Sequence, residues 1–478
     1  YVSITKPSRS KSGRRVWAYG SPKPSPLPRC WLSLSLRATT ATRDAGNAWG
    51  VTWAYRAGVL ALLIVHAADI HLDSPLRNLV LSEEAQIARV RRATRDAFEA
   101  LVQLCIDRGA ALLLLAGDLY DRDTPNMQTA VFLRQQILKL ARANIRVAIK
   151  LGNHDAGNRI SSALELPDNA HIFSAKKPES VSYDDLGIVV HGQSFKPGPV
   201  TENLVIGYPA PIRGKLNIGV LHTSLAGYPE HDPYAPCRLE ELTTKGYAYF
   251  ALGHIHKGAF LAENPWVVYP GNLQGRNAKE TGPKGCVVIE ADDKRILSVE
   301  KVALDVVRWQ QLRIDLTASQ SEQEMIELTR AALVQARTDS DDRPSAVRVV
   351  LDGRTPISRD LAKRPRRLQQ TIIELAGEIS EALWLEQIRD DTAPLVASAP
   401  SAGGEAASEL GQIILETAQN PAPLLADLQR DLSTLKGKLP DDLKQHPALR
   451  VIEDPKSLGA AIARLAPRLA ARLAGEEG

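Results

Sequence analysis

Side chains that could bind a metal recur in this chain directly after short apolar runs. They occur in the segments AADIHLD, LAGDLYD, LGNHDAG, GVLHTS and ALGHIHKG. Ligands of open α/β sheets bind at the carboxyl ends of strands, so these side chains are expected to converge at one edge. Burying so many polar groups is costly unless something satisfies them, and two divalent cations would do so. The predicted metal ligands are Asp69, His71, Asp118, Asn153, His222, His254 and His256.

The predicted ligands divide into two sets around a shared carboxylate. The first set is Asp69, His71, Asp118 and His256, and the second is Asp118, Asn153, His222 and His254. Asp118 can bridge because the two oxygens of a carboxylate can span cations about 3.5–4 Å apart. His254 and His256 are two apart, and on an extended chain they would face one spot, each reaching a different ion. Carboxylate, amide and imidazole ligands without thiolate favour Mn²⁺, Fe²⁺ or Zn²⁺ over Mg²⁺.

Two divalent cations suit the hydrolysis of phosphate esters. Such a pair clamps the phosphate oxygens and lowers the pKa of a water molecule, which supplies hydroxide near neutral pH. His154 follows the ligand Asn153 and could donate to a phosphate oxygen or to the leaving group. Asp155 could hold the imidazole of His154 in the required tautomer. We therefore predict His154 and Asp155 as catalytic residues.

Each of these motifs is weak by itself. An aspartate after a strand is often a helix cap, GNHD could be a turn, and His222 could be a satisfied core histidine. Their order along the chain, each at a predicted strand end, favours the metal centre. His66, His171, His191 and His446 have no motif around them and are expected to be structural. His231, in YPEHDPYAPC, could lie on a surface loop or face the substrate.

Alternating strands and helices would position these residues from about residue 60 onwards. Strands are predicted at LALLIVHAAD, ALLLLAGD and IRVAIKLGNHD, with helices at 83–107 and 128–143. This alternation indicates a largely parallel sheet buried on both faces. A second, mixed sheet stacked on the first is predicted from the runs at 187–191, 215–222, 247–252, 266–269, 286–290 and 296–303.

Composition divides the chain into five parts. Residues 1–58 are rich in Ser, Pro and Arg and are expected to be a disordered or extraneous extension. Residues 59–304 would form the catalytic domain, and residues 305–390 a small α/β domain with a helix at 321–337 between two strands. Residues 391–406, DTAPLVASAPSAGGEA, have linker composition. Residues 407–478 are expected to be amphipathic helices broken by prolines, which could dock a partner coiled coil or pack on the small domain.

Charge and cysteine content narrow the class of protein. The net charge of +4 is concentrated in the first 60 residues, where ten Lys or Arg accompany one acid, Asp44. The remainder is mildly acidic, so charge alone does not predict nucleic-acid binding. Cys30, Cys105, Cys237 and Cys286 form no CxxC pair, which excludes a thiolate zinc site and indicates a reducing, cytoplasmic compartment. The apolar run at 57–65 is too short to span a bilayer.

The ordered motifs D-x-H, G-D, G-N-H-D, H and G-H-x-H resemble those of the calcineurin-like metallophosphoesterases. ADIHLDSP lacks the G-D-x-H-G of the Ser/Thr phosphatases, and GDLYDRDTPN is similar to the SbcD-type DNA repair exonucleases. GYPEHDPYAPCRLEEL, KGYAYFALGHIHKG and YPGNLQGRNAKETGPKGC are similar to the YhaO-like bacterial members of that branch. The resemblance covers residues 62–303 closely and continues more loosely to about residue 390.

The resemblance implies a fold, an activity and partners. The fold would be α/β, with a four-layer sandwich of two mixed sheets flanked by helices, then a small α/β cap that positions DNA and a helical tail. The activity would be that of a metal-dependent DNA exonuclease, and also of an endonuclease, acting in DNA repair with two Mn²⁺ ions. The implied partners are DNA, an SMC-like coiled-coil ATPase and a second copy of the chain, with no membrane.

An arginine-rich segment of the predicted cap agrees with binding of DNA. In RTPISRDLAKRPRRLQQ, six cations could each neutralise a phosphate without reading sequence. A solvated helix face explains the same residues equally well. The six are Arg354, Arg359, Lys363, Arg364, Arg366 and Arg367.

Two other functions stay open at the level of the sequence. A two-metal phosphodiesterase or phosphatase acting on small molecules or phosphoproteins would need the same metal ligands. A mainly structural DNA-end-binding subunit of an ATPase complex is the second, although an intact ligand set argues against it. Comparing hydrolysis of a generic phosphodiester with that of duplex ends separates these from a nuclease.

Overall fold

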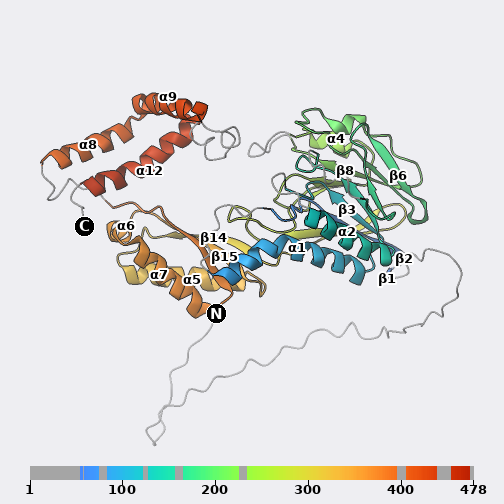
Figure 1. Ribbon diagram of the computed structural model, residues 1–478, viewed down its shortest axis with the longest axis horizontal. Helices are drawn as coiled ribbons and strands as arrows, with labels where there is room; N and C mark the ends of the chain where they lie inside the picture. Colours follow the sequence, from blue (N-terminus) through green and yellow to red (C-terminus); the bar gives the residue numbers. More distant parts are fainter. Residues whose placement is uncertain are drawn as a thin grey trace, which may run out of the picture. The chain divides into compact units, whose positions relative to one another are not determined.

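The computed structural model describes residues 54–56, 59–74, 83–121, 127–156, 165–225, 234–395, 405–438 and 454–473 (Figure 1). Most of the predicted N-terminal extension lies outside these residues, as do His231, His446 and Cys30. Three residues of that extension do belong to the fold, because β1 (Ala54–Arg56) pairs antiparallel with β2 (Val59–Ala67).

The first sheet contains the strands that precede the predicted ligands. β2, β3 (Leu112–Ala116), β4 (Arg146–Lys150) and β5 (Ala170–Ile172) run parallel in that order. The crossover helices α1 (Glu84–Asp107) and α2 (Met127–Arg142) connect β2 to β3 and β3 to β4, as the sequence predicts. The motifs at 69–71, 118 and 153–155 therefore leave the carboxyl ends of three parallel neighbours.

Two strands assigned to the second sheet from sequence belong to the first instead. β12 (Gly285–Ala291) pairs antiparallel with β2, and β13 (Ile296–Ala303) pairs antiparallel with β12. The assignment to the second sheet was wrong because strand order cannot be read from spacing. Both faces of β12 are apolar, with Cys286 and Val288 in one core and Val287 and Ile289 in the other, which suits a place beside the central β2.

The second sheet has the order β10-β11-β9-β8-β7-β6 and confirms the predicted mixed topology. Its central strands β7 (Ile188–Gly192), β8 (Leu216–His222), β9 (Tyr249–Gly253) and β11 (Trp266–Tyr269) run parallel. Its antiparallel edges are β6 (Glu179–Tyr183) and β10 (Ala259–Glu263). The strands β5, β6 and β10 are short and at most partly buried over most of their length, so their pattern did not predict them. β8 and β9 end at His222 and at the GHIH motif.

The two sheets stack with helices on the outside, which confirms the four-layer α/β sandwich. Phe98 of α1 and Leu133 of α2 pack on the outer face of the first sheet, where the two helices lie side by side (Figure 1). Ile64 of β2 and Ile218 of β8 belong to the core between the sheets. The outer face of the second sheet is covered by the short α4 (Leu239–Thr243) and irregular segments, with Phe250 in that core.

A three-stranded parallel sheet follows the sandwich. It is formed by β14 (Arg308–Asp315), β15 (Ser345–Asp352) and β16 (Leu383–Asp390), of which β16 was not predicted. α5 (Glu322–Thr338) and α7 (Pro365–Ile379) pack on one face, and α6 (Ser358–Lys363) precedes α7. On the other face, Trp309 and Trp384 join a core cluster with Val90 and Ala93 of α1.

The C-terminal part contains the helices α8 (Glu405–Gln419), α9 (Ala422–Lys438) and α12 (Pro455–Leu473), orange to red in Figure 1. The predicted helical tail is thus confirmed as helical. Among the described residues, no helix combines the length and the hydropathy that crossing a membrane requires.

Candidate metal centre

The loops after β2 and β3 lie side by side and carry three of the predicted ligands. The backbone N–H of Asp69 donates to Gly117 O at 3.1 Å, and that of His71 donates to Asp118 O at 3.0 Å. Asp69, His71 and Asp118 have positive φ angles of 50°, 47° and 50°. Such left-handed conformations cost non-glycine residues about 1–3 kcal/mol and cluster at functional sites. Main-chain bonds between the two loops therefore hold the ligands in place.

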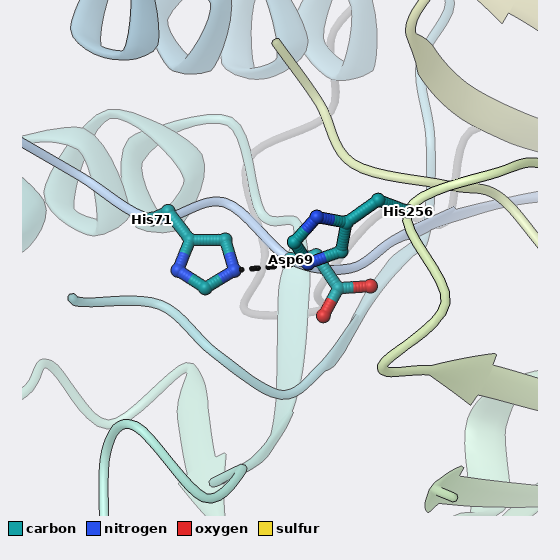
Figure 2. Close-up of side chains that lie close together, drawn as sticks. All are labelled: Asp69, His71 and His256. Carbon is teal, nitrogen blue, oxygen red and sulfur yellow. Dashed lines mark hydrogen bonds between the residues drawn. The ribbon is translucent and has the colours of Figure 1, made fainter. Parts of the chain in front are cut away.

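The first predicted set of ligands converges. Figure 2 shows Asp69, His71 and His256 close together, and one ligand atom from each lies within 4.8 Å of the other two. The Nε2 atoms of His71 and His256 are 3.3 Å apart, and His71 Nε2 is 4.0 Å from Asp118 Oδ2. Asp69, His71 and His256 thus lie within reach of one position, and Asp118 approaches this group at His71.

The second predicted set meets at His222. Its Nε2 is 3.1 Å from Asn153 Oδ1 and 3.3 Å from Asp118 Oδ2. The ring centroid of His254 is 5.2 Å from that of His222. Asp118 therefore contacts both groups of ligands, which is the position that the bridging role requires. Asp69 also approaches this set, because its Oδ1 is 3.9 Å from His222 Nδ1.

The expected extended backbone at GHIH is wrong. β9 ends at Gly253, and His254 has a φ of 98°, so the chain turns between the two histidines. The N–H of His254 donates to the carboxylate of Asp69 at 3.0 Å, which stabilises this turn. His254 then packs against His222, while His256 packs against His71. Each histidine reaches a different group of ligands, as expected, but by a bend rather than by strand alternation.

Hydrogen bonds to the outer nitrogens direct two imidazole lone pairs into the centre. His222 Nδ1 lies 2.9 Å from the carbonyl oxygen of Ala116, so Nδ1 carries the proton and donates. His256 Nδ1 likewise donates to Glu280 Oε1 at 2.8 Å. Metal-binding histidines characteristically donate their second N–H in this way. Nε2 of His222 then faces two oxygen ligands, Asp118 Oδ2 at 3.3 Å and Asn153 Oδ1 at 3.1 Å, which are the atoms that would hold a cation together with it. The residues therefore fit a metal centre.

Burial sets the charge states of the ligands. It lowers the pKa of His71 well below its ordinary value and also lowers that of His256, so both imidazoles are neutral near pH 7. Burial and the neighbouring Asp118 raise the pKa of Asp69 well above its ordinary value. Burial acts against ionisation of Asp118 too, but its charge and hydrogen-bond interactions with His222 hold its pKa well below the usual range. Bound divalent cations would offset the electrostatic repulsion between these two buried carboxylates.

His154 lies at the edge of this centre with its side chain 29% exposed. Its Nε2 is 4.0 Å from Asp118 Oδ2, and its Nδ1 is 3.1 Å from Asp121 Oδ1. The role predicted for Asp155 is wrong, because the carboxylate beside the His154 imidazole is that of Asp121. Asp121 was missed although it lies within GDLYDRD, since no spacing rule joins it to a histidine 33 residues later.

Asp155 organises the backbone instead. Its carboxylate accepts N–H groups from Gly152 at 2.9 Å, Tyr120 at 3.0 Å and Leu119 at 3.2 Å. These bonds tie the loop after β3 to the loop after β4. Burial raises the pKa of Asp155 to about 6. Asp155 therefore supports the loops that carry Asp118 and Asn153.

Two glycines allow the ligand loops to approach closely. A Cβ on Gly152 would lie 2.1 Å from Asp118 Oδ1, and one on Gly117 would lie 2.3 Å from His222 Nδ1. Gly117 also has a φ of 100°, which favours glycine. The glycines of the GD and GNHD motifs are therefore required by the packing of the ligands themselves.

The histidines expected to be structural and described by the structure form hydrogen bonds away from the centre. His66 Nδ1 bonds Tyr249 Oη at 3.0 Å, and His171 Nε2 bonds Glu179 Oε1 at 2.7 Å. His191 Nε2 bonds Asn217 Oδ1 at 3.0 Å.

The six cations of the arginine-rich segment lie on the small domain rather than on the ligand loops. The backbone of Arg354 pairs with that of Ala393 in an isolated β-bridge. α6 carries Arg359 and Lys363. Arg364 is the N-cap residue of α7, whose first turn carries Arg366 and Arg367. All except Arg359 are exposed. Arg364 and Arg367 line a small cavity with Glu322 and Asp360, and Arg367 pairs with Glu322 at 3.4 Å.

Comparison with known proteins finds separate family matches for the sandwich and for the small domain. The model of the calcineurin-like phosphoesterase family matches residues 62–258, and that of the middle domain of metallophosphoesterase YhaO matches residues 309–393. The uncharacterized metallophosphoesterase YhaO of Bacillus subtilis is 32% identical over 339 residues, which are 69% of this chain and 82% of that protein.

More distant relatives are named for nucleic-acid processing. One subunit of the nuclease SbcCD of Staphylococcus saprophyticus is 25% identical over 49% of this chain and 66% of its own length. DNA double-strand break repair protein Mre11 of Methanopyrus kandleri is 24% identical over 40% of this chain and 44% of its own. The family match, the YhaO relative and the converging ligands agree: the chain belongs to the calcineurin-like metallophosphoesterases, which hydrolyse phosphate esters.

Proposed function

We propose that this metallophosphoesterase is a metal-dependent DNA exonuclease, with endonuclease activity as well, that acts in DNA repair. The observation that carries the proposal is the placement of Asp118 between His71 Nε2 at 4.0 Å and His222 Nε2 at 3.3 Å, each within a cluster of possible ligands. The names of the relatives, one a part of a nuclease and the other a double-strand break repair protein, support DNA as the substrate.

The proposed metal ligands are the seven residues predicted from sequence. Asp69, His71, Asp118 and His256 would hold one cation, and Asp118, Asn153, His222 and His254 the other. The donor set suits Mn²⁺, Fe²⁺ or Zn²⁺, and of these Mn²⁺ is proposed because the family resemblance implies it. When bound, two such cations neutralise the phosphate oxygens and lower the pKa of an attacking water. The chain contributes fixed ligands, held by the main-chain bonds between the loops after β2 and β3.

His154 is the proposed catalytic residue of the chain. Its Nδ1 is engaged with Asp121, which leaves Nε2 on the side of Asp118 and the metal centre. From there Nε2 can donate to a phosphate oxygen or protonate the leaving oxygen. Asp121 holds the imidazole in place and stabilises its protonated form. The pKa of Asp121 is lowered because, against the effect of burial, its hydrogen bonds with His154 and Ser74 favour the carboxylate.

The remaining assignments concern the rest of the chain. We propose that residues 59–304 are the catalytic domain, that residues 305–390 are a cap that positions DNA through its arginine-rich segment, and that 391–406 link it to the helices of 407–478. An SMC-like ATPase is the proposed partner, supported by a relative named as one part of a nuclease complex. Self-association is proposed as well. The free thiols of Cys105, Cys237 and Cys286 support the proposed cytoplasmic location.

Nuclease assays on the purified chain test this function. Linear duplex DNA, with and without Mn²⁺, is compared with bis(p-nitrophenyl) phosphate, each with wild type and Asp118→Asn. We expect Mn²⁺-dependent loss of nucleotides from DNA ends that Asp118→Asn abolishes. Hydrolysis of the chromogenic ester without any action on DNA would favour a phosphodiesterase of small molecules. Protection of DNA ends without cleavage in Mn²⁺ would favour a structural role.

A further inference from the structure

One arginine near the metal centre has no role in the assignments above. Arg276 lies in the segment between β11 and β12, and its side chain is only 17% exposed. Its guanidinium contacts two carboxylates from different parts of the chain. Nη2 donates to Glu280 Oε1 at 2.9 Å, and Nη1 donates to Asp121 Oδ2 at 3.4 Å. Nη2 also lies 3.2 Å from Nδ1 of His256.

Each of those carboxylates holds one imidazole of the site. Glu280 accepts the proton of His256 Nδ1 at 2.8 Å, and His256 is a proposed metal ligand. Asp121 contacts His154 Nδ1 at 3.1 Å, and His154 is the proposed catalytic residue. Arg276 therefore closes a continuous chain of polar contacts, His154–Asp121–Arg276–Glu280–His256.

The segment that carries Arg276 is itself anchored. Trp309 of β14 donates its indole Nε1–H to the carbonyl of Gly275 at 2.7 Å, and Gln274 Nε2 donates to Val307 O at 2.7 Å. The backbone N–H of Arg276 donates to Glu280 Oε2 at 2.8 Å. The guanidinium thus starts from a backbone that is held by hydrogen bonds at Gln274, Gly275 and Arg276.

We propose that Arg276 is a positioning residue that keeps His154 at a fixed place relative to His256 and thereby to the metal centre. A guanidinium suits this task because its planar, rigid arrangement of N–H groups can serve two carboxylates at once, whereas an ammonium is a point donor. This inference rests on one part of the proposed function, the hydrolysis of phosphate esters at this centre. It does not require that the substrate is DNA.

A competing role for Arg276 is direct binding of the substrate phosphate. Its contacts argue against that role, since Nε, Nη1 and Nη2 all face carboxylates of the protein. The two roles differ in kinetics. Removal of a substrate contact made equally before and during reaction raises KM, whereas misplacement of His154 lowers kcat and leaves KM nearly unchanged.

The test compares Arg276→Met and Arg276→Lys with the control variant Arg146→Met. Arg146 is the first residue of β4, its side chain is 23% exposed, and its guanidinium pairs with Asp185. Steady-state hydrolysis of bis(p-nitrophenyl) phosphate and Mn²⁺ binding by calorimetry are measured, with folding checked by circular dichroism. For both Arg276 variants we expect kcat lower by about 10–100-fold and Mn²⁺ affinity lower by about 10-fold, as for other residues that support metal ligands. Arg146→Met should match wild type.

A double-mutant cycle with His154→Ala shows whether Arg276 acts through that imidazole. We expect Arg276→Met to lower kcat much less in the His154→Ala background than in wild type. Equal losses in both backgrounds would overturn the proposal, as would a KM increase at unchanged kcat, or full activity and Mn²⁺ affinity in Arg276→Met. If Arg276→Met does not fold, Arg276→Lys and Asp121→Asn carry the same test. If the wild type hydrolyses neither the ester nor DNA, the proposed function is wrong, and Mn²⁺ binding still decides whether Arg276 supports His256.

Discussion

The metal centre and the arginine-rich segment of the small domain are both rich in charge, but they are built in opposite ways. In the centre, Asp69, Asp118 and His222 are almost wholly buried, and each is fixed by several contacts. In the segment, Arg364 and Arg366 are exposed on α7 and its cap. A buried charge must be matched by partners in a set geometry, whereas an exposed one remains hydrated and movable.

This difference bears on what each region can do. Fixed donors in a water-poor site can distinguish a transition state from a ground state, which is the basis of catalysis. Exposed cations attract a phosphate backbone over some distance, in a manner that salt weakens. Substitutions in the centre should therefore remove chemistry for every substrate, while those in the segment should affect long nucleic acids alone.

The largest effect is expected for Asp118→Ala. It removes the carboxylate that contacts both groups of ligands, so Mn²⁺-dependent hydrolysis should fall by at least about 10³-fold for DNA and for a small phosphodiester alike. Initial rates with both substrates measure this, with Asp185→Ala as a control on an exposed carboxylate. Substantial activity in Asp118→Ala would remove the two-metal assignment.

His154→Ala should come next. Loss of a positioned proton donor lowers rates by about 10²–10⁴-fold, and we expect the lower end of this range for an activated ester with a good leaving group. Mn²⁺ binding, measured by calorimetry, should be retained because the proposed ligand set does not include His154. A variant that binds two metal ions and reacts at the full rate would exclude the catalytic role.

Asp155→Ala should destabilise the fold rather than change the chemistry directly. Three buried backbone N–H groups, of Gly152, Tyr120 and Leu119, would lose their acceptor. A loss on the order of 3 kcal/mol in the free energy of unfolding is expected, measured with urea. Asp155→Asn retains one oxygen acceptor and should lose less. Equal stability of wild type and Asp155→Ala would contradict the supporting role given to this residue.

The combined change Arg364→Gln, Arg366→Gln and Arg367→Gln tests the other side of the comparison. We expect DNA affinity to fall about 10-fold and the slope of log K against log salt to decrease by about one for each phosphate that is no longer neutralised. Hydrolysis of bis(p-nitrophenyl) phosphate should be unchanged. If DNA binding and its salt dependence stay the same, the segment is simply a solvated helix face.

The smallest expected effect is a loss of stability at acidic pH that arises from His66. Burial lowers the pKa of His66 to about 3, against about 6.5 when unfolded, so the unfolded chain binds more protons between these values. The stability that neutral His66 contributes is present above pH 6.5 and is lost as pH falls from there towards 3, at no more than about 1.4 kcal/mol per pH unit. Residues 305–395 contain no histidine. Hydrogen exchange should therefore show that β2 and β9 are less protected at pH 5.5 than at pH 7, relative to the small domain. His66→Phe should reduce this difference between the two pH values.

Local patterns predicted the elements that carry the ligands. β2, β3, β4, β8 and β9 were expected from apolar runs, and the ligands were expected at their ends. β5, β6 and β10 were missed because they are short and half-buried, and β12 was assigned to the wrong sheet because pairing is a long-range property. In the same way, Asp121 and Glu280 were missed because the histidines that they hold are 33 and 24 residues away.

The amino-acid sequence by itself determined the kind of chemistry, because residue types and strand-end positions are local features that restrict the ligand set. Only the tertiary structure decided how the groups are used. The bend at His254, the backbone role of Asp155 and the contacts of Arg276 with both Asp121 and Glu280 depend on which loops lie side by side. That proximity follows from how the two sheets stack and how their strands are ordered, which no spacing along the chain encodes.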